Sequence, residues 1–205
     1  MNDELSHVTG IAGIMQYHKH LAETYGSGST GALGWLHAEG QQARFQMLSR
    51  IGDMNGCSVL DAGCGHADLI SFLKEKYPTL IYYGYEQIPE LLNIAAYRHK
   101  GEKNITLYLE NFLQHALPLT DYILASGSLN YRHEENGFIY KAITTLYAQC
   151  RLGVGFNLLS GGVDADTLLV AYDVQEIIRF CGTLSNRVEL QEGYWQDDFT
   201  VFMYR

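Results

Sequence analysis

The stretch SVLDAGCGHADLISFL, residues 58–73, decides the fold of this chain. Its apolar beginning ends in Asp61, and small residues follow at Gly63, Gly65 and Ala67 before a helical pattern opens. A short apolar strand, a glycine turn and a helix in this order are typical of a nucleotide-cofactor site in an α/β sheet. The glycines let the backbone turn tightly and approach a ligand without interference from a Cβ atom. The stretch therefore predicts a cofactor bound beyond the end of the first strand.

Two familiar phosphate-binding loops do not fit this turn. The dinucleotide fingerprint G-x-G-x-x-G/A, counted from Gly63, places Asp68 at its sixth position. A carboxylate there would face the negative pyrophosphate at the helix N-terminus, which disfavours a nicotinamide cofactor. No G-K-[ST] follows a glycine loop, which excludes a P-loop.

Strands and helices alternate from residue 57 onward. Apolar runs predict strands at 57–63, 80–86, 104–111, 120–128 and 154–161. Amphipathic patterns predict helices at 67–77, 89–100, 136–151 and 174–182. Two β-rich runs, 187–191 and 199–205, flank a polar turn and predict an antiparallel hairpin. This order favours an α/β fold with a doubly wound, mostly parallel sheet that ends in a C-terminal antiparallel hairpin.

The first 56 residues carry a different pattern. Apolar side chains at helical spacing predict helices at 11–25 and 38–51, joined by the flexible segment GSGSTG at 26–31. We therefore divide the chain into an N-terminal helical extension, or lid, at 1–56 and an α/β domain at 57–205.

Composition and charge exclude several classes of partner. The chain of 205 residues has a formal net charge of −9, and no lysine or arginine cluster could neutralise nucleic-acid phosphates. No apolar run approaches the roughly 20 residues that span a bilayer, and the polar start MNDELSHVTG does not resemble a signal peptide. The four cysteines form no C-x-x-C pair, as is typical of free thiols in a reducing compartment. We predict a cytoplasmic protein without nucleic-acid or membrane partners.

The second marker of the cofactor site is Glu86, at the end of the second predicted strand. An acid at this position can accept hydrogen bonds from both hydroxyl groups of a ribose. An acidic side chain at a strand end can also be merely solvated. The combination of strand, D-x-G-x-G, helix, strand and acid is more specific than either half.

These residues together resemble the class I S-adenosylmethionine-dependent methyltransferases. The agreement covers about 57–205 and lies at V-L-D-A-G-C-G, Y-G-Y-E and D-Y-I-L-A-S-G. The resemblance implies a Rossmann-like methyltransferase domain with a seven-stranded sheet and with S-adenosyl-L-methionine as its cofactor. The family often has glycine at position 67. We expect Ala67 to lie in the first helical turn, where alanine favours the helix, and cofactor binding to tolerate it.

The resemblance also implies roles for single residues around the glycine turn. The loop of Gly63, Cys64 and Gly65 would wrap the methionine part of the cofactor. Asp61 would shape this loop and reach the ammonium group directly or through water, and Glu86 would hold the ribose hydroxyls. Gln87 and Ile88 would pack on the adenine.

Further cofactor contacts would come from outside this turn. The family often has an acid after the third strand that accepts from the adenine amino group; here that position is Asn111, next to Phe112. An amide oxygen can accept the same hydrogen bond. Ser126 would border the cofactor. Arg44, in the element Q-x-x-R-F before the glycine strand, either pairs with the methionine carboxylate or is a solvated surface arginine.

The loop ASGSLNYRH, 125–133, is the expected border of the acceptor pocket. Asn130 and Tyr131 would face the acceptor, whereas Asn157 is either a pocket residue or a satisfied core amide. Family members that methylate nucleic acids or proteins often carry [DN]-P-P-[YFW] after the fourth strand, and this chain has S-G-S-L there. Its absence, together with the acidic charge, favours a small-molecule acceptor.

Aromatic and histidine side chains complete the acceptor-side candidates. Tyr17, Tyr25 and Trp35 of the predicted lid either line the acceptor site or simply cover the sheet. His37 and His133 are candidate general bases, although the sequence assigns no catalytic residue. His18 and His20 lie two positions apart on a predicted helix and do not share a face, so we predict no metal site.

Three hypotheses for the function remain. The first is methyl transfer to a small molecule by in-line displacement, in which the protein aligns the nucleophile and excludes water. The second is a protein that binds S-adenosylmethionine or S-adenosylhomocysteine without methyl transfer, such as a regulatory subunit. The third is an enzyme that uses the bound sulfonium only electrostatically. A dehydrogenase ranks last because of Asp68.

Overall fold

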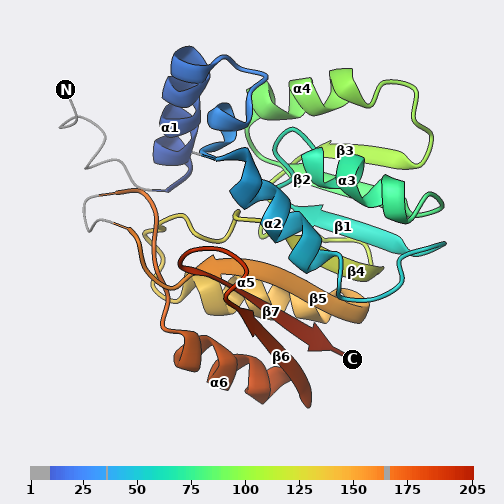
Figure 1. The fold of residues 1–205 in the computed structure, drawn as a ribbon, viewed down its shortest axis with the longest axis vertical. Helices are drawn as coiled ribbons and strands as arrows, with labels where there is room; N and C mark the ends of the chain where they lie inside the picture. Colours follow the sequence, from blue (N-terminus) through green and yellow to red (C-terminus); the bar gives the residue numbers. More distant parts are fainter. Residues whose placement is uncertain (1–9, 36, 164–166) are drawn as a thin grey trace.

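A seven-stranded sheet forms the centre of the molecule (Figure 1). The computed structural model describes residues 10–35, 37–163 and 167–205. The strands follow the order β3-β2-β1-β4-β5-β7-β6, and β7 runs antiparallel to the other six strands. Their bounds are β1 (Ser58–Ala62), β2 (Ile81–Glu86), β3 (Ile105–Leu109), β4 (Thr120–Ala125), β5 (Cys150–Leu159), β6 (Arg187–Glu192) and β7 (Asp198–Tyr204). The predicted doubly wound sheet and its C-terminal hairpin are confirmed.

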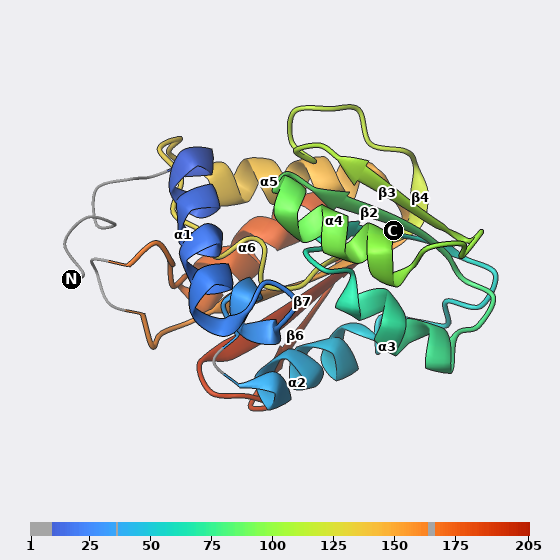
Figure 2. The ribbon, with the colours of Figure 1, turned by 90° about the horizontal axis from the view of Figure 1, so that it is seen from above.

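Helices cover both faces of this sheet. α2 (Ala38–Leu48), α3 (Asp68–Lys76) and α4 (Pro89–Arg98) contribute to one apolar cluster, and α5 (Phe138–Ala148) and α6 (Val174–Leu184) contribute to another. Figure 2 shows α2 and α3 on one side of the sheet and α5 and α6 on the other. A sheet buried on both faces explains why the strand sequences are continuous apolar runs. Along β1, for example, Val59 joins the first cluster and Leu60 the second.

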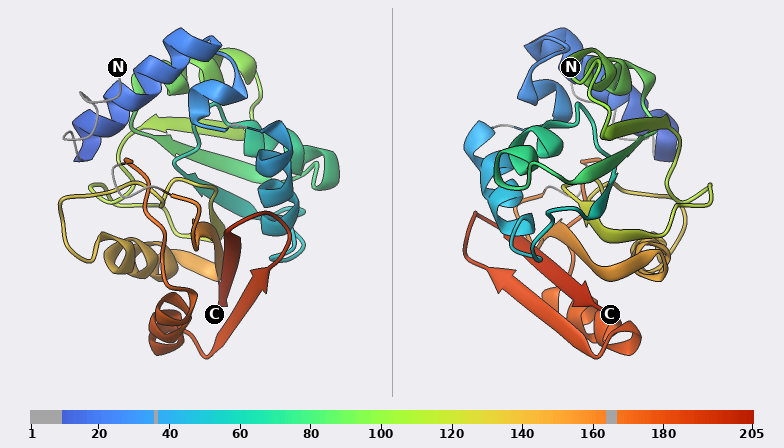
Figure 3. Two further views of the ribbon diagram at one scale, coloured as in Figure 1. Left: turned by 60° about the vertical axis from the view of Figure 1, so that its left-hand side comes forward. Right: turned by 90° about the vertical axis from the view of Figure 1, so that its right-hand side faces the viewer.

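The fifth strand begins earlier than its sequence predicts. The pattern predicts a helix to residue 151 and a strand from residue 154, but α5 ends at Ala148 and β5 begins at Cys150. Cys150 is in register with Thr120 of β4, and the Thr120 amide donates to the Gln149 carbonyl at 3.1 Å. The pairing of β5 with β4 therefore ends α5 before the helical pattern of the sequence ends. Figure 3 shows the closing hairpin of β6 and β7 at the edge of the sheet opposite to β3.

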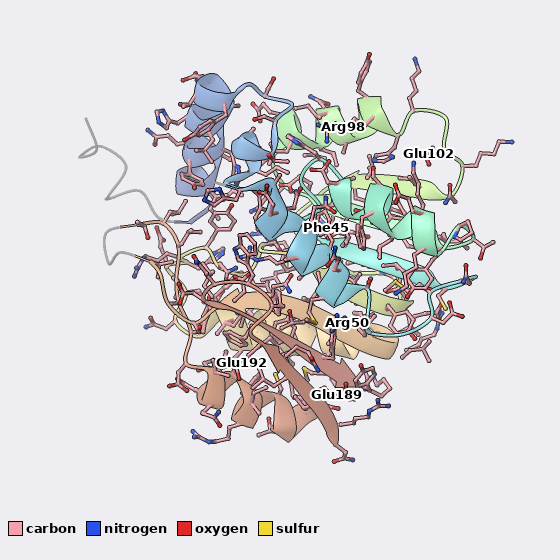
Figure 4. All side chains as sticks on the ribbon, in the orientation of Figure 1. Phe45, Arg50, Arg98, Glu102, Glu189 and Glu192 are labelled. Carbon is pink, nitrogen blue, oxygen red and sulfur yellow. The ribbon has the colours of Figure 1, made fainter. Side chains whose placement is uncertain are left out.

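The N-terminal helices divide between the core and the strand ends. On α2, Phe45 is buried and packs against Phe72 of α3, with 5.9 Å between ring centroids (Figure 4). In contrast, α1 (Gly10–Tyr25) and the short 3₁₀ helix η1 (Thr30–Leu33) pack on each other beside the carboxyl ends of the parallel strands (Figure 1). The polar start at 1–9 lies outside the described residues, and within the described ranges no helix is long and apolar enough to cross a bilayer.

Candidate active site

A cavity of about 380 Å³ lies at the carboxyl ends of the parallel strands, where the strand order reverses between β1 and β4. Ligands of open α/β sheets bind at this kind of switch point. The floor comes from the turn after β1, the end of β2 and the loop after β4. The walls include residues of α1, η1 and α2, of the segment that follows β5 and of the loop between β6 and β7.

The turn after β1 requires glycine at two positions. Gly63 and Gly65 adopt φ angles of +82° and +55°, in the left-handed region that favours glycine. A Cβ atom on Gly63 would collide with the Ser128 side chain, and one on Gly65 would lie 2.8 Å from Leu33. The Gly63 and Cys64 amides both donate to the Tyr85 carbonyl, at 2.8 Å and 2.9 Å. The turn is thus held open along the cavity floor.

Ala67 does not lie in the first helical turn, so that expectation is wrong. α3 begins at Asp68, and Ala67 is the residue before it, with a φ angle of +58°. The side chain is fully buried in the apolar cluster that α3 shares with β1. The left-handed backbone conformation costs a residue with a Cβ atom roughly 1–2 kcal/mol. Ala67 is therefore a strained residue and does not favour the helix.

Asp61 is a buried carboxyl group in the cavity lining. Its side chain is buried, and its Oδ2 accepts a hydrogen bond of 2.6 Å from the Tyr82 hydroxyl. Its Oδ1 has no hydrogen-bond partner among the described residues. Burial raises the pKa of Asp61 to about 7, against the opposing effect of the Tyr82 hydroxyl, and the charges of Glu86 and Asp68 add to the increase. A buried carboxylate oxygen without a partner is a binding position for a cationic group.

Glu86 holds the glycine turn in place. Its Oε2 accepts from the Gly65 amide at 2.9 Å, and its Oε1 accepts from the amides of Gln87 and Ile88 at 2.8 Å and 2.9 Å. Burial raises the pKa of Glu86, and the three amide donors lower it. Since each carboxylate oxygen can accept more than one hydrogen bond, the ribose role stays a prediction compatible with these contacts.

Arg44 lies in the cavity wall but already has an ionic partner. Its Nε and Nη2 atoms donate to the two carboxylate oxygens of Asp198, both at 2.5 Å, and both side chains are buried. The guanidinium carbon lies 4.4 Å from the centre of the Trp35 ring, and Nη1 faces Gly127. The position is not that of a solvated surface arginine. Pairing with a methionine carboxylate stays a prediction for the Nη1 side.

The predicted acceptor-side residues separate into two groups. The cavity lining includes Tyr17, Trp35, His37, Asn130 and Tyr131. Asn130 also braces the pocket, because its side-chain oxygen accepts from the Leu159 amide at 3.0 Å.

Three predicted residues lie outside the lining. Tyr25 is largely exposed at the end of α1. His133 stacks on Phe138 with 3.4 Å between ring centroids. Asn157 lies within the β5–β7 pair, where its amide nitrogen donates to Thr200 at 2.5 Å and to Tyr194 at 3.1 Å. Asn157 is thus a core amide outside the cavity lining, although its Oδ1 has no hydrogen-bond partner among the described residues.

Comparison with known proteins agrees with this geometry. No family model matches the chain. A Mycobacterium tuberculosis protein named as a methyltransferase is 28% identical over 155 residues, which cover 71% of this chain and 92% of that protein. The trans-aconitate 2-methyltransferase of Mycobacterium ulcerans is 28% identical over 102 residues, 50% of this chain and 37% of that protein. Magnesium protoporphyrin IX methyltransferase from Synechocystis, solved with bound S-adenosylmethionine, shares the fold at a TM-score of 0.64, with 15% identity over 82% of this chain and 80% of that one.

The chain has the fold of the class I S-adenosylmethionine-dependent methyltransferases, and its sequence is similar to proteins named as methyltransferases. The residues present fit the cofactor of this class. The unpartnered Oδ1 of Asp61 offers an acceptor for its ammonium group, and the open glycine turn lies directly beside it. The Ser126 hydroxyl also lines the cavity and is buried without a partner among the described residues.

Around the predicted adenine position, the cavity lining differs from the predicted set by one residue. Gln87, Ile88 and Phe112 line the cavity, but Asn111 does not. The Asn111 oxygen accepts from the Leu113 amide at 2.8 Å, and its nitrogen donates to Gln87 at 2.9 Å. Its neighbour Glu110 lines the cavity instead.

Sequence reasoning missed several residues of the cavity lining. His18, Gln41, Trp195 and Asp197 all line the cavity. His18 follows Ile14 at helical spacing, and this pattern indicated only a buried face of the helix. Trp195 and Asp197 belong to the polar turn between the last two strands, and its composition gave no signal of a pocket.

Proposed function

We propose that this methyltransferase acts on a small-molecule acceptor by in-line displacement. The observation that carries the proposal is one cavity whose lining combines two kinds of side chain. Asp61 and Glu86 provide buried carboxyl groups, and Tyr17, Trp35 and Tyr131 provide aromatic surface. A shared cavity brings a cofactor and a small acceptor into the proximity that a displacement requires.

The size and charge of the cavity support a small acceptor. A volume of about 380 Å³ is within the range of small-molecule sites. We propose that α1 and η1 act as the lid that excludes water from the reacting atoms, because both line the cavity beside the strand ends. The net charge of −9 and the carboxylates in the lining disfavour a nucleic acid as the acceptor.

The chain's own residues bind and orient under this proposal. S-adenosylmethionine supplies an electrophilic methyl group. Asp61 accepts a hydrogen bond from the ammonium group, and Glu86 fixes the glycine turn and accepts from the ribose hydroxyls. Ile88 and Phe112 provide apolar surface for the adenine. Catalysis then depends mainly on alignment and on exclusion of water.

Two measurements test the proposal. Thermal shift with S-adenosylmethionine, S-adenosylhomocysteine and NAD is expected to show stabilisation by the first two alone, because a ligand that binds the folded state raises its melting temperature. Incubation with labelled methyl donor is then expected to label compounds in a protein-free metabolite pool and not RNA or DNA. Labelling confined to nucleic acid would contradict the small-molecule acceptor, and stabilisation by NAD alone would contradict the cofactor site.

We further propose that the protein works in the cytoplasm. The support is its set of free thiols: Cys57, Cys64, Cys150 and Cys181 form no disulfide, and all but Cys57 are buried. Unpaired cysteines are typical of a reducing compartment. Fractionation followed by detection of the protein in the cytoplasmic fraction tests this proposal.

A further inference from the structure

A histidine and a tyrosine from distant parts of the chain form a hydrogen-bonded pair in the cavity wall. His18 lies on α1, and Tyr131 lies in the loop after β4. The Nδ1 of His18 lies 2.8 Å from the Ala32 carbonyl oxygen, and its Nε2 lies 2.8 Å from the Tyr131 hydroxyl. Because a carbonyl only accepts, Nδ1 carries the proton of the neutral ring. Nε2 is therefore free to accept the proton of the Tyr131 hydroxyl.

The surroundings keep this pair neutral. Burial lowers the pKa of His18, and the hydrogen bond to the Ala32 carbonyl partly opposes this effect. Burial raises the pKa of Tyr131. Tyr17 packs edge-on against both rings, with centroid distances of 5.4 Å and 6.4 Å. Other titratable and charged groups also face the pair: His66 of the glycine turn interacts with His18, and Glu86 and Arg44 interact with Tyr131.

We infer that Tyr131 contacts a hydroxyl group of the methyl acceptor and that His18 takes up the proton through Tyr131. This inference rests on the proposed function. The acceptor O–H bond breaks, its proton passes to the Tyr131 oxygen, and the Tyr131 proton passes to Nε2 of His18. The acceptor oxygen forms the new bond to the methyl carbon, and the electron pair of the broken C–S bond stays on sulfur. His18 ends as an imidazolium whose Nδ1–H still donates to Ala32, so it acts as a positioning residue and Tyr131 as the catalytic one.

The charge of the cavity defines the acceptor class further. Among the described residues, the lining includes the carboxyl groups of Asp61, Asp68, Glu86, Glu110 and Asp197, of which Asp68 is paired with Arg98. Its only arginine or lysine among those residues is Arg44, which is paired with Asp198. An anionic acceptor would meet repulsion there. Aromatic side chains also belong to the lining, namely Tyr17, Trp35 and Trp195. The acceptor is thus an uncharged aromatic compound with a hydroxyl group.

Three probes and two variants test the pair. Labelled methyl transfer from S-adenosylmethionine is measured with phenol, with the more acidic 4-nitrophenol and with benzoate. Wild type is expected to methylate phenol fastest, the ionised 4-nitrophenol more slowly because its charge meets the carboxylates of the lining, and benzoate not at all. Tyr131→Phe and His18→Gln are expected to lose about 100-fold or more with phenol, the usual contribution of general base catalysis. The loss with 4-nitrophenol is expected to be much smaller, because an acceptor that is already ionised needs no base.

A matched control separates chemistry from structure. His20 lies on the same helix, is exposed and lines no part of the cavity, so His20→Gln is expected to behave as wild type with both phenols. The wild-type rate with phenol is expected to fall as pH drops through the lowered pKa of His18, and this limb is expected to vanish in His18→Gln. Equal losses with both phenols, or an unchanged pH limb, would overturn the inference.

A readout without turnover completes the test. ¹⁵N NMR of the cofactor-free protein is expected to show His18 as the Nδ1–H tautomer, with a pKa below the ordinary value of about 6.5. The opposite tautomer overturns the inference, as does transfer to benzoate alone or to none of the probes. Thermal shift with S-adenosylhomocysteine distinguishes the failures: normal stabilisation without transfer to phenols contradicts only this inference, whereas no stabilisation contradicts the proposed function as well.

Discussion

At the scale of single residues, Glu86 links the second strand to the glycine turn. Its two oxygens accept from three backbone amides, and hydrogen bonds to a charged group contribute roughly 1.5–3 kcal/mol each. We expect Glu86→Gln to place an amide nitrogen against backbone N–H donors. It should lower the free energy of unfolding by about 2 kcal/mol or more and weaken S-adenosylhomocysteine binding at least about tenfold.

Urea unfolding and titration calorimetry measure the two effects of Glu86→Gln. Glu90→Gln is the matched control, since Glu90 is exposed in the first turn of α4. Glu90→Gln is expected to lower the free energy of unfolding by only a few tenths of a kcal/mol, because it removes a charge that interacts with the helix dipole. Unchanged binding in Glu86→Gln would mean that the glycine turn does not depend on this carboxylate.

Ala67 gives a second prediction, because its φ angle of +58° disfavours side chains branched at Cβ. Ala67→Val is expected to cost more than about 2 kcal/mol, from backbone strain and from overpacking at a fully buried position. Ala67→Gly is expected to stay within about 1 kcal/mol of wild type, since relief of strain offsets the lost methyl group. Ala96→Val, at an exposed position of α4, gives the cost of the same substitution where the backbone is helical and the side chain has room. Equal costs for both valine variants in chemical denaturation would contradict the strain argument.

At the scale of elements, one buried ion pair connects α2 to β7. Arg44 and Asp198 are 154 residues apart in the chain, and both side chains are buried. Asp198→Asn leaves a buried cation without its counter-charge, and we expect a loss of about 3–5 kcal/mol in the free energy of unfolding. Glu135→Gln is the control, because Glu135 pairs with Lys141 at the surface, where an ion pair contributes at most about 1 kcal/mol.

The double variant Arg44→Met with Asp198→Leu distinguishes the contribution of the two charges from that of the packing around them. Replacement of both charges by apolar groups is expected to recover most of the loss, because no unpaired charge remains. A double variant as unstable as Asp198→Asn would show that the packing around the pair, and not its charge, stabilises the contact.

The helices and strands also show how much of the structure could be predicted from the sequence. The elements from β1 to β4 follow from local apolar runs and turn residues, and Asp61 and Glu86 follow from their positions at strand ends. Asn111 was predicted in place of Glu110 because the end of β3 shifts by two residues from the pattern, which changes the side chains that face the cavity. Trp195 enters the site only because β7 inserts between β5 and β6, and such an arrangement of strands is not encoded in local spacing.

At the scale of the whole molecule, Asp61 makes stability and cofactor binding depend on pH in opposite directions. Burial raises its pKa to about 7, whereas the unfolded chain titrates near 3.9. Between about pH 4 and pH 7 the folded state holds a proton that the unfolded state has released, so this contribution to stability falls as pH rises through that window. An ammonium group beside Oδ1 favours the ionised carboxylate. Binding therefore releases a proton and strengthens as pH rises toward 7.

His66 opposes this trend in the free protein. Burial lowers its pKa to about 4, so the unfolded chain binds the extra proton below about 6.5, and stability falls as pH drops through that window. The contribution of Asp61 is isolated by comparison with Asp61→Asn, in which His66 is unchanged. From pH 5 to pH 8 we expect Asp61→Asn to gain about 3 kcal/mol relative to wild type, measured by urea unfolding. Glu75→Gln, at an exposed position of α3, should show no such gain.

The cofactor response then follows from the same carboxylate. In wild type, the thermal shift produced by saturating S-adenosylhomocysteine is expected to grow between pH 5.5 and pH 7.5, because ligand binding favours the ionised form of Asp61. In Asp61→Asn the shift is expected to be smaller and nearly independent of pH. A pH-dependent shift that survives in Asp61→Asn would place the ammonium group elsewhere. A constant shift in wild type would mean that binding does not ionise Asp61, and the fit of this carboxylate to the cofactor would have to be abandoned.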